Sequence, residues 1–170
     1  DTSDRLLAEL AEHRLDLVLS DAPVSSMIRV KAFNHALGEC GITFFAAPPL
    51  AKQYAKRFPE SLNNAPMLFP IEGSSLRRGL DQWFETRDIR PAIAGEFKDS
   101  ALLKTFGQAG IGVFPAPTVI EKEVKEHYKV QIIGRTTDVI EQFYAISIER
   151  KLKHPAVLAI TEAARERLFA

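Results

Sequence analysis

Helical and strand-like patterns of apolar residues alternate along the chain. An apolar stripe within residues 6–10 predicts a first helix, which Ser3 or Asp4 can cap. The nearly continuous apolar stretch 17–19 follows at once and is typical of a parallel strand covered on both faces. The chain is therefore expected to open with a helix that leads directly into a buried strand.

Two strand patterns lie nearly in series, in residues 28–33 and 42–47, and the join between them contains Gly38 and Gly41. The first pattern alternates apolar and polar residues, which indicates one exposed face. Strands joined in this way suggest that the chain passes from one lobe into another. A second passage of the same kind is expected near residues 142–148.

The middle of the chain repeats a strand, a turn and a helix. Strands are predicted at residues 67–69, 92–97, 111–114 and 129–133, and helical turns are predicted to start at 73–75, 99–100 and 115–118. Trp83 lies at helical spacing from Leu76 and Leu80, so we expect it in the core. A last helix begins at Pro155. This alternation implies right-handed crossovers, mainly parallel sheets and two α/β lobes. One lobe is formed by the continuous middle part of the chain, and the other combines the N-terminal part with the C-terminal helix.

The composition is that of a neutral, folded domain. Apolar residues make up 46% of the chain, which is enough for a core and too much for a disordered segment. Lys plus Arg and Asp plus Glu both total 22, so this segment is not expected to bind nucleic acid by itself. The single cysteine, Cys40, excludes an intrachain disulfide and is typical of a reducing cytoplasm. No apolar run approaches the roughly 18 residues of a membrane span.

Small polar residues follow several predicted strands. In open α/β sheets, ligands bind outside the carboxyl ends of the strands, where helix amides and helix dipoles are available. The candidate binding residues are Ser20, Asp21, Gly73, Ser74, Ser75, Phe97, Asp99, Ser100, Phe114 and Pro115. Ordinary helix capping is the alternative for each serine and aspartate. Taken together, the four strand ends predict a small-ligand site in a cleft between two lobes.

Side chains suited to catalysis or metal binding are scattered. None of the four histidines has a second histidine at metal-ligand spacing. Cys40 is either a nucleophile or a buried structural cysteine, and the second interpretation is the commoner one. Carboxylates at Glu39, Glu96, Asp21 and Asp99 offer oxygen ligands for a hard cation, or are surface and capping residues. An enzyme would have to depend on Cys40 or a carboxylate pair, so we expect none.

Four stretches carry a resemblance to a known family. They are LDLVLSD at 15–21, LDQWF at 80–84, GIGVFP at 110–115 and HPAV at 154–157. Together they resemble the regulatory domain of LysR-type transcription regulators, and the likeness runs over essentially the whole chain. Within that family the chain is similar to activators of sodium/proton antiporter genes, in stretches that include GECG at 38–41.

The resemblance implies a type II periplasmic-binding-protein-like fold. Its second lobe would cover residues 41–144, and its first would combine 1–40 with 145–170 and be incomplete at the N-terminus. An effector between the lobes would shift the arrangement of a homodimer or tetramer, and an absent winged helix-turn-helix domain would bind DNA. The protein would be a cytoplasmic activator without a cofactor, an enzymatic activity or a membrane partner.

For the antiporter-gene activators the implied signal is sodium ion with pH, or else a small solute. Glu39 and Glu96 are candidate sodium ligands on oxygen chemistry alone. The family's effector sites use the strand and helix ends named above, so the resemblance implies effector contacts at Ser20, Ser74, Ser75, Ser100, Phe114 and Pro115. A periplasmic-type solute-binding protein shares the two-lobed arrangement and is the alternative function.

Overall fold

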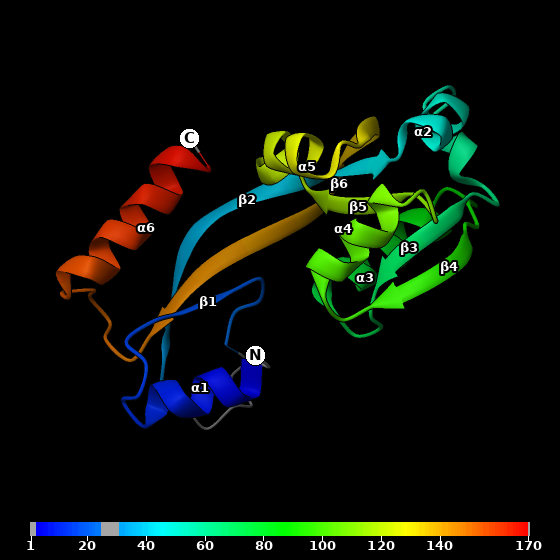
Figure 1. The fold of residues 1–170 in the computed structure, drawn as a ribbon. Coiled ribbons are helices and arrows are strands. Elements are labelled where there is room, and N and C mark those ends of the chain that lie inside the picture. Colours follow the sequence, from blue (N-terminus) through cyan, green and yellow to red (C-terminus); the bar gives the residue numbers. More distant parts are fainter. Residues whose placement is uncertain (1–2, 25–30, 170) are drawn as a thin grey trace. The chain divides into compact units, whose positions relative to one another are not determined.

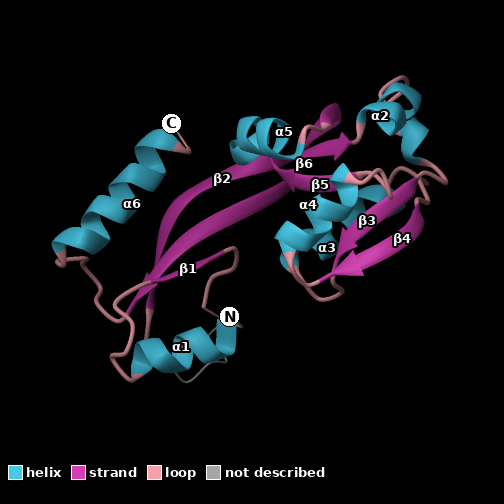
Figure 2. Cartoon of the chain, viewed as in Figure 1, coloured by secondary structure: helices cyan, strands magenta, loops and turns pink. Residues whose placement is uncertain are grey.

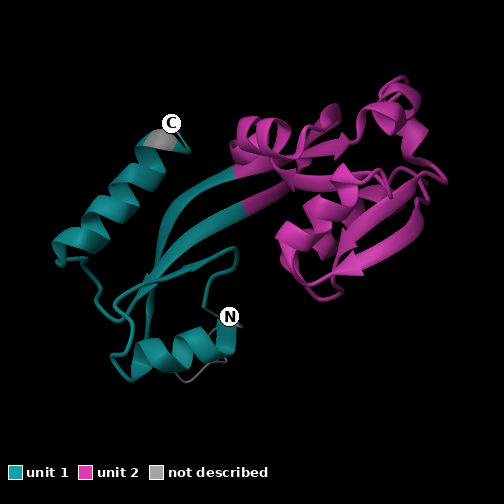
Figure 3. Ribbon diagram, in the orientation of Figure 1, with its two compact units in different colours: residues 1–39, 142–170 teal, residues 40–141 magenta. Residues whose placement is uncertain are grey.

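Two long strands, β2 (Phe33–Ala46) and β6 (Gln131–Ser147), are shared between two parts of the chain. The computed structural model describes residues 3–24 and 31–169. It divides into one unit of residues 1–39 and 142–170 and a second of residues 40–141 (Figure 3). The boundaries fall inside β2 and β6, and the lobe boundaries predicted at residues 40 and 145 lie within the same strands.

Each long strand replaces two strands predicted from the sequence. In β6 the predicted strands 129–133 and 142–148 are joined into one strand, and buried positions recur between them at Thr136, Val139 and Glu141. Thr136 and Glu141 are polar although they are buried, so these positions do not stand out in the sequence as part of a strand. In β2 the strand runs without interruption through Gly38 and Gly41. Residues 28–30 of the predicted strand 28–33 lie outside the described residues.

The sheets are less parallel than the sequence pattern suggests. A four-stranded sheet has the order β1-β6-β2-β5, in which β1 (Val18–Ser20) is antiparallel to β6 and β5 (Phe114–Pro117) is antiparallel to β2. A parallel pair joins β3 (Pro66–Pro70) to β4 (Ala92–Phe97). The prediction of a parallel strand covered on both faces near residue 18 was wrong. Val18 is buried, but Leu19 is 58% exposed, so β1 has one open face.

Helices α1 and α6 belong to the first unit (Figure 1). Helix α1 (Ser3–Ala11) buries Leu7 and Leu10 in a cluster with Val18 of β1 and Ile146 of β6. Helix α6 (Pro155–Arg167) begins with a proline at its first turn, as predicted, because that position needs no amide donor.

The second unit holds the larger core. Its helices and strands can be followed in Figure 2. Its remaining elements are α2 (Pro48–Tyr54), η1 (Glu60–Leu62), α3 (Ser75–Glu85), α4 (Ser100–Gln108), η2 (Thr118–Ile120) and α5 (Glu121–Tyr128). Trp83 is 4% exposed and stacks on Phe44 with ring centroids 5.4 Å apart, which confirms its expected place in the core. A second cluster contains Phe45, Leu103 and Phe114.

Strand β5 lies further along the chain than predicted. The sequence suggests a strand at 111–114 and a helical turn from Pro115, whereas the structure pairs 114–117 with β2. Pro115 and Pro117 fit this strand because they alternate, so both missing amide donors fall on the same edge, away from β2. Val113 still forms an isolated parallel bridge to Met67 of β3. In the described chain no helix is long and apolar enough to cross a membrane.

Candidate functional site

The carboxyl ends of β3 and β4 lie together in the second unit. The parallel pairing sets Pro70 opposite Phe97, and the Ile71 amide donates a hydrogen bond of 2.8 Å to the Phe97 carbonyl. Helices α3 and α4 begin just beyond these ends, at Ser75 and Ser100. The structure therefore brings the predicted positions 73–75 and 97–100 to one edge.

Ser74 is the N-cap of α3. Its Oγ accepts a hydrogen bond from the Arg77 amide at 3.2 Å and donates one to the Ile71 carbonyl at 3.0 Å. Gly73 has φ of +84°, which glycine adopts readily, and this turn lets the chain enter the helix. Capping accounts for the Ser74 hydroxyl, and the neighbouring Ser75 is half-buried.

Asp99 caps α4 and leaves Ser100 at the surface. The Asp99 Oδ1 accepts hydrogen bonds from the amides of Ala101 (2.7 Å) and Leu102 (3.2 Å). The exposed Ser100 Oγ accepts a hydrogen bond from the Lys104 Nζ at 3.4 Å, one helical turn further on. Ser100 and Lys104 thus form a hydroxyl–ammonium pair on one face of α4.

Lys104 is a half-buried cation at this edge, and its hydrogen-bond partner, the Ser100 hydroxyl, is neutral. Burial lowers the pKa of Lys104, and the negative charges of Asp99 and Glu141 only partly oppose that effect. Among the described residues, no carboxylate forms an ion pair with its ammonium. A partly desolvated cation of this kind gains from an incoming anion. Lys104 was not among the predicted site residues, although its i,i+4 spacing from Ser100 was a usable signal.

Arg77 holds the same edge together from the inside. It is 6% exposed, donates from Nε to both Asp81 carboxylate oxygens (2.9 and 3.0 Å), and donates from Nη1 to the Pro70 carbonyl (3.1 Å) and to Glu96. Burial alone would lower the pKa of Arg77, but the hydrogen bonds to Glu96 and Asp81 outweigh it and raise the pKa. Glu96 is therefore committed to fixing β4 against α3.

The two candidate sodium ligands lie in different units. Glu96, in the second unit, is ion-paired with Arg77. Glu39, in the first unit, accepts a hydrogen bond of 3.1 Å from Gln142 Nε2. The described part of the chain contains no group of three or more His, Cys, Asp or Glu side chains placed to hold a metal ion. Sodium binding by Glu39 and Glu96 stays a prediction.

Two of the predicted contacts are core residues. Phe114 is 0% exposed and stacks on Phe45 with ring centroids 5.5 Å apart, and Pro115 is also buried. The reason is the shifted register of β5, whose carboxyl end is at Pro117 instead of Phe114. Phe97 is half-buried at the end of β4, beside the ring of Phe106.

Ser20 and Asp21 follow β1 in the first unit. The Ser20 Oγ donates to the Ala22 carbonyl (2.8 Å) and accepts from the Ala22 amide (3.1 Å), so this hydroxyl closes a local turn. Asp21 is exposed. Both residues stay predicted effector contacts.

Cys40 is half-buried in β2 and carries a free thiol. Burial raises the pKa of this thiol, the charge of Glu141 adds to the effect, and the backbone amides of Val119 and Thr118 oppose it. The thiolate is the nucleophilic form, so a raised pKa disfavours a catalytic role. The structural interpretation of Cys40 fits this environment.

Comparison with known protein families shows to which family the chain belongs. The model of the LysR substrate binding domain matches residues 1–169. The chain belongs to this family. It is a LysR-type effector-binding domain with the two-lobed, periplasmic-binding-protein-like type II fold. The whole-chain match is to the family that the sequence stretches resemble.

Curated relatives of this LysR-type domain are transcription activators. The chain is 36% identical, over 99% of its length, to the transcriptional activator protein NhaR of Escherichia coli (strain K12) and to that of Shigella flexneri. It spans about half the length of these relatives, since the match covers 55% of each.

Solved structures show the same fold at low sequence identity. The effector-binding domain of QuiR, in complex with shikimate, is 18% identical, with a TM-score of 0.69 over 100% of this chain and 81% of that one. The apo regulatory domain of HypT from Salmonella typhimurium is 15% identical, with a TM-score of 0.68 over 97% of this chain and 79% of that one.

Proposed function

We propose that this chain is the sensing part of a cytoplasmic LysR-type transcription activator. The observation that carries the proposal is the 36% identity to NhaR over 99% of the chain. The whole protein would be a homodimer or tetramer and would bind DNA through a winged helix-turn-helix domain outside these residues. The balance of 22 basic and 22 acidic residues supports a DNA contact elsewhere, because DNA-binding surfaces are usually basic.

The effector we propose is a small organic anion bound at the start of α4. Lys104 supports this choice, because its ammonium is half-buried and its hydrogen-bond partner is the neutral Ser100 hydroxyl. A carboxylate would accept hydrogen bonds from both groups, and such charge-assisted bonds are strong. Ser20 and Asp21 remain predicted contacts from the first lobe.

Sodium ion is the second candidate, and the resemblance to antiporter-gene activators motivates it. Moving a switch from mostly one state to mostly the other takes about 5.5 kcal/mol of differential binding. One monovalent cation provides little of this at a single site. Sodium would therefore have to act cooperatively across subunits or through coupled protonation of a carboxylate such as Glu39.

Thermal unfolding of the full-length protein distinguishes the two candidates. Sodium, potassium and lithium chlorides are compared at matched ionic strength, and a panel of acetate, lactate, citrate, benzoate and shikimate is tested in parallel. A ligand of the folded state raises the melting temperature by mass action, by an amount that grows with its concentration over Kd. The proposal expects a shift with at least one organic acid. A shift of the melting temperature with sodium alone contradicts an organic anion as the effector and supports sodium ion.

The other functions considered from the sequence are less well supported. The curated relatives are transcription regulators, which disfavours both an enzyme and a periplasmic solute-binding protein for transport. The raised pKa of the Cys40 thiol disfavours the thiolate, which is the form that a cysteine-dependent enzyme needs. We propose that the chain has no catalytic activity and no resident cofactor.

A further inference from the structure

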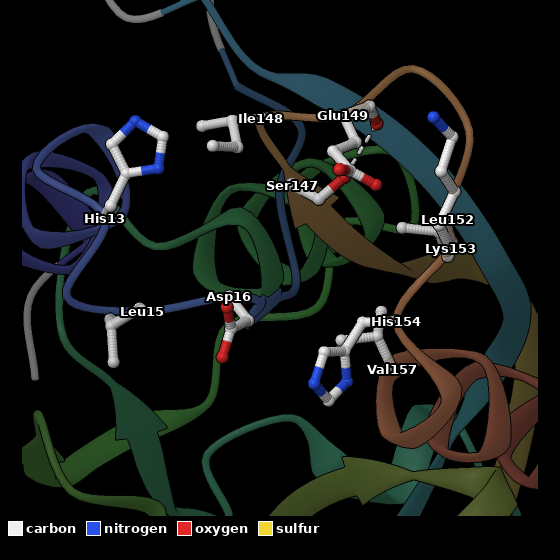
Figure 4. A pocket seen from close by; sticks show the side chains of 10 residues that line it. All are labelled: His13, Leu15, Asp16, Ser147, Ile148, Glu149, Leu152, Lys153, His154 and Val157. Atoms are coloured by element: carbon white, nitrogen blue, oxygen red, sulfur yellow. Dashed lines mark hydrogen bonds between the residues drawn. The ribbon is translucent and has the colours of Figure 1, made fainter.

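A cavity of about 240 Å³ opens within the first unit, and all of its lining residues belong to that unit. It is built by the turn between α1 and β1, the end of β6 and the segment that leads into α6. The lining residues are His13, Leu15, Asp16, Ser147, Ile148, Glu149, Leu152, Lys153, His154 and Val157 (Figure 4). We refer to it as the α1–α6 cavity.

The lining divides into an apolar floor and a charged rim. The floor residues Leu15, Ile148, Leu152 and Val157 are buried or half-buried. The rim residues are the exposed ones, and Figure 4 shows them together with the floor residues around the cavity; they are His13, Asp16, Glu149, Lys153 and His154. This division gives a place for an apolar group below and for charged groups above.

The rim carries both signs of charge without ion pairs. Within the described residues, neither Asp16 nor the Glu149 carboxylate forms an ion pair or a side-chain hydrogen bond, and the same holds for the Lys153 ammonium. His154 occupies the N-cap position of α6 but makes no side-chain capping bond, so its imidazole is available to the opening. A simple anion would meet two carboxylates here, and a simple cation would meet a lysine. A molecule that carries both charges complements the whole rim.

The volume limits the size of such a molecule. A water molecule takes about 30 Å³ in the liquid, so a cavity of about 240 Å³ has room for about eight waters. That corresponds to a ligand of about eight to ten non-hydrogen atoms, the size of a free amino acid with an aliphatic side chain. The floor can bury the aliphatic part, which favours binding by removing apolar surface from water.

We propose that the α1–α6 cavity binds a small zwitterionic amino acid with an apolar side chain. Lys153 binds the α-carboxylate, Asp16 binds the α-ammonium, and Leu152 and Val157 contact the side chain. The site is separate from the proposed anion site at the start of α4, so it adds a second input to the sensing domain.

Isothermal titration of the full-length protein with L-leucine tests this proposal. Isocaproate lacks the ammonium, isoamylamine lacks the carboxylate, and glycine lacks the apolar side chain. The variants are Asp16→Asn and Lys153→Gln, with Lys122→Gln and Glu123→Gln on the exposed face of α5 as matched controls. All four side chains are exposed, and thermal unfolding checks that each variant folds as the wild type does.

Leucine is expected to bind more tightly than its three fragments. Asp16→Asn and Lys153→Gln should each weaken binding about tenfold or more, since each removes a charge-assisted hydrogen bond. The two control variants, and Ser100→Ala at the other proposed site, should leave leucine binding unchanged. The proposal is overturned if leucine does not bind, if isocaproate or isoamylamine binds equally well, or if the cavity variants behave like the controls. Loss of leucine binding in Ser100→Ala would instead place leucine at the start of α4.

Discussion

Gly107 packs its Cα directly against the ring of Phe114, which makes the contact between α4 and β5 sensitive to a single methyl group. A Cβ atom at position 107 would lie 2.1 Å from Phe114 Cδ1 and 2.3 Å from Cε1. Phe114 cannot turn away, because it is 0% exposed and its ring stacks on Phe45. The variant Gly107→Ala therefore forces α4 and β5 apart.

The size of the effect follows from two opposing contributions. Overpacking of a well-packed core costs about 1–3 kcal/mol of unfolding free energy. Replacing a helical glycine by alanine returns about 1 kcal/mol through helix propensity. Because the new Cβ would lie 2.1 Å from an atom of a fully buried ring, we expect the overpacking cost to fall in the upper part of that range, at about 2–3 kcal/mol. After the gain in helix propensity, the loss is about 1–2 kcal/mol, which corresponds to a fall of about 2–8 °C in melting temperature for a domain of this size.

Urea unfolding followed by tryptophan fluorescence measures this loss, because Trp83 is the single tryptophan and is buried in the same unit. Gly79→Ala in α3 is the matched control. Its Cβ would meet only one side-chain atom, the Val139 Cγ1 at 2.9 Å, and that methyl can move. The control should stay within about 1 kcal/mol of the wild type and can be more stable, since it keeps the helix-propensity gain.

A double-mutant cycle with Phe114→Leu shows whether the ring is responsible. The smaller side chain leaves room for the new methyl group, so the double variant should lose less stability than the sum of the single variants, by about 1 kcal/mol. The reasoning is refuted if Gly107→Ala is as stable as the wild type, or if the two substitutions are additive.

Three further results are expected. Leu10→Ala in α1 removes a side chain that is 0% exposed, so it should destabilise the first unit by about 2–5 kcal/mol in calorimetry. A loss below about 1 kcal/mol would contradict the place of Leu10 in the core. Hydrogen bonds from Arg135 are the main reason why the pKa of Glu121 is lowered. These bonds therefore stabilise the folded protein at pH values above the ordinary glutamate pKa of about 4.3. The stabilisation is lost as the pH falls through the lowered pKa of Glu121. The stability gap between the wild type and Arg135→Gln should therefore close in acid, whereas a gap that is constant down to pH 3 would count against the pair. Burial raises the pKa of the Cys40 thiol, so iodoacetamide at neutral pH should modify it more slowly in the folded protein than in urea, and equal rates would disagree with the structure.

Local signals explain which elements could be predicted from the sequence. The N-caps Ser74 and Asp99 and the turn at Gly73 are encoded by the residues themselves, so the starts of α3 and α4 were predicted correctly. Strand pairing depends on residues far apart in sequence. That is why the antiparallel partner of β1 and the register of β5 were not predicted.

The same distinction applies to the candidate site. The strand ends at 73–75 and 97–100 could be located because the strand and helix boundaries are local. The burial of Phe114 depends on the pairing of β5 with β2, and the desolvation of Lys104 depends on its tertiary surroundings. Sequence periodicity shows neither property, and for this reason the predicted site includes Phe114 and lacks Lys104.

The central claim is that a small organic anion binds the ammonium and hydroxyl at the start of α4. The most direct test takes the acid from the panel that raises the melting temperature most and titrates it calorimetrically into the wild type, Lys104→Gln, Ser100→Ala and the exposed control Lys122→Gln. The account predicts binding about tenfold or more weaker for Lys104→Gln, weaker binding for Ser100→Ala, and no change for Lys122→Gln. Equal affinity in all four proteins would place the effector elsewhere and contradict the account.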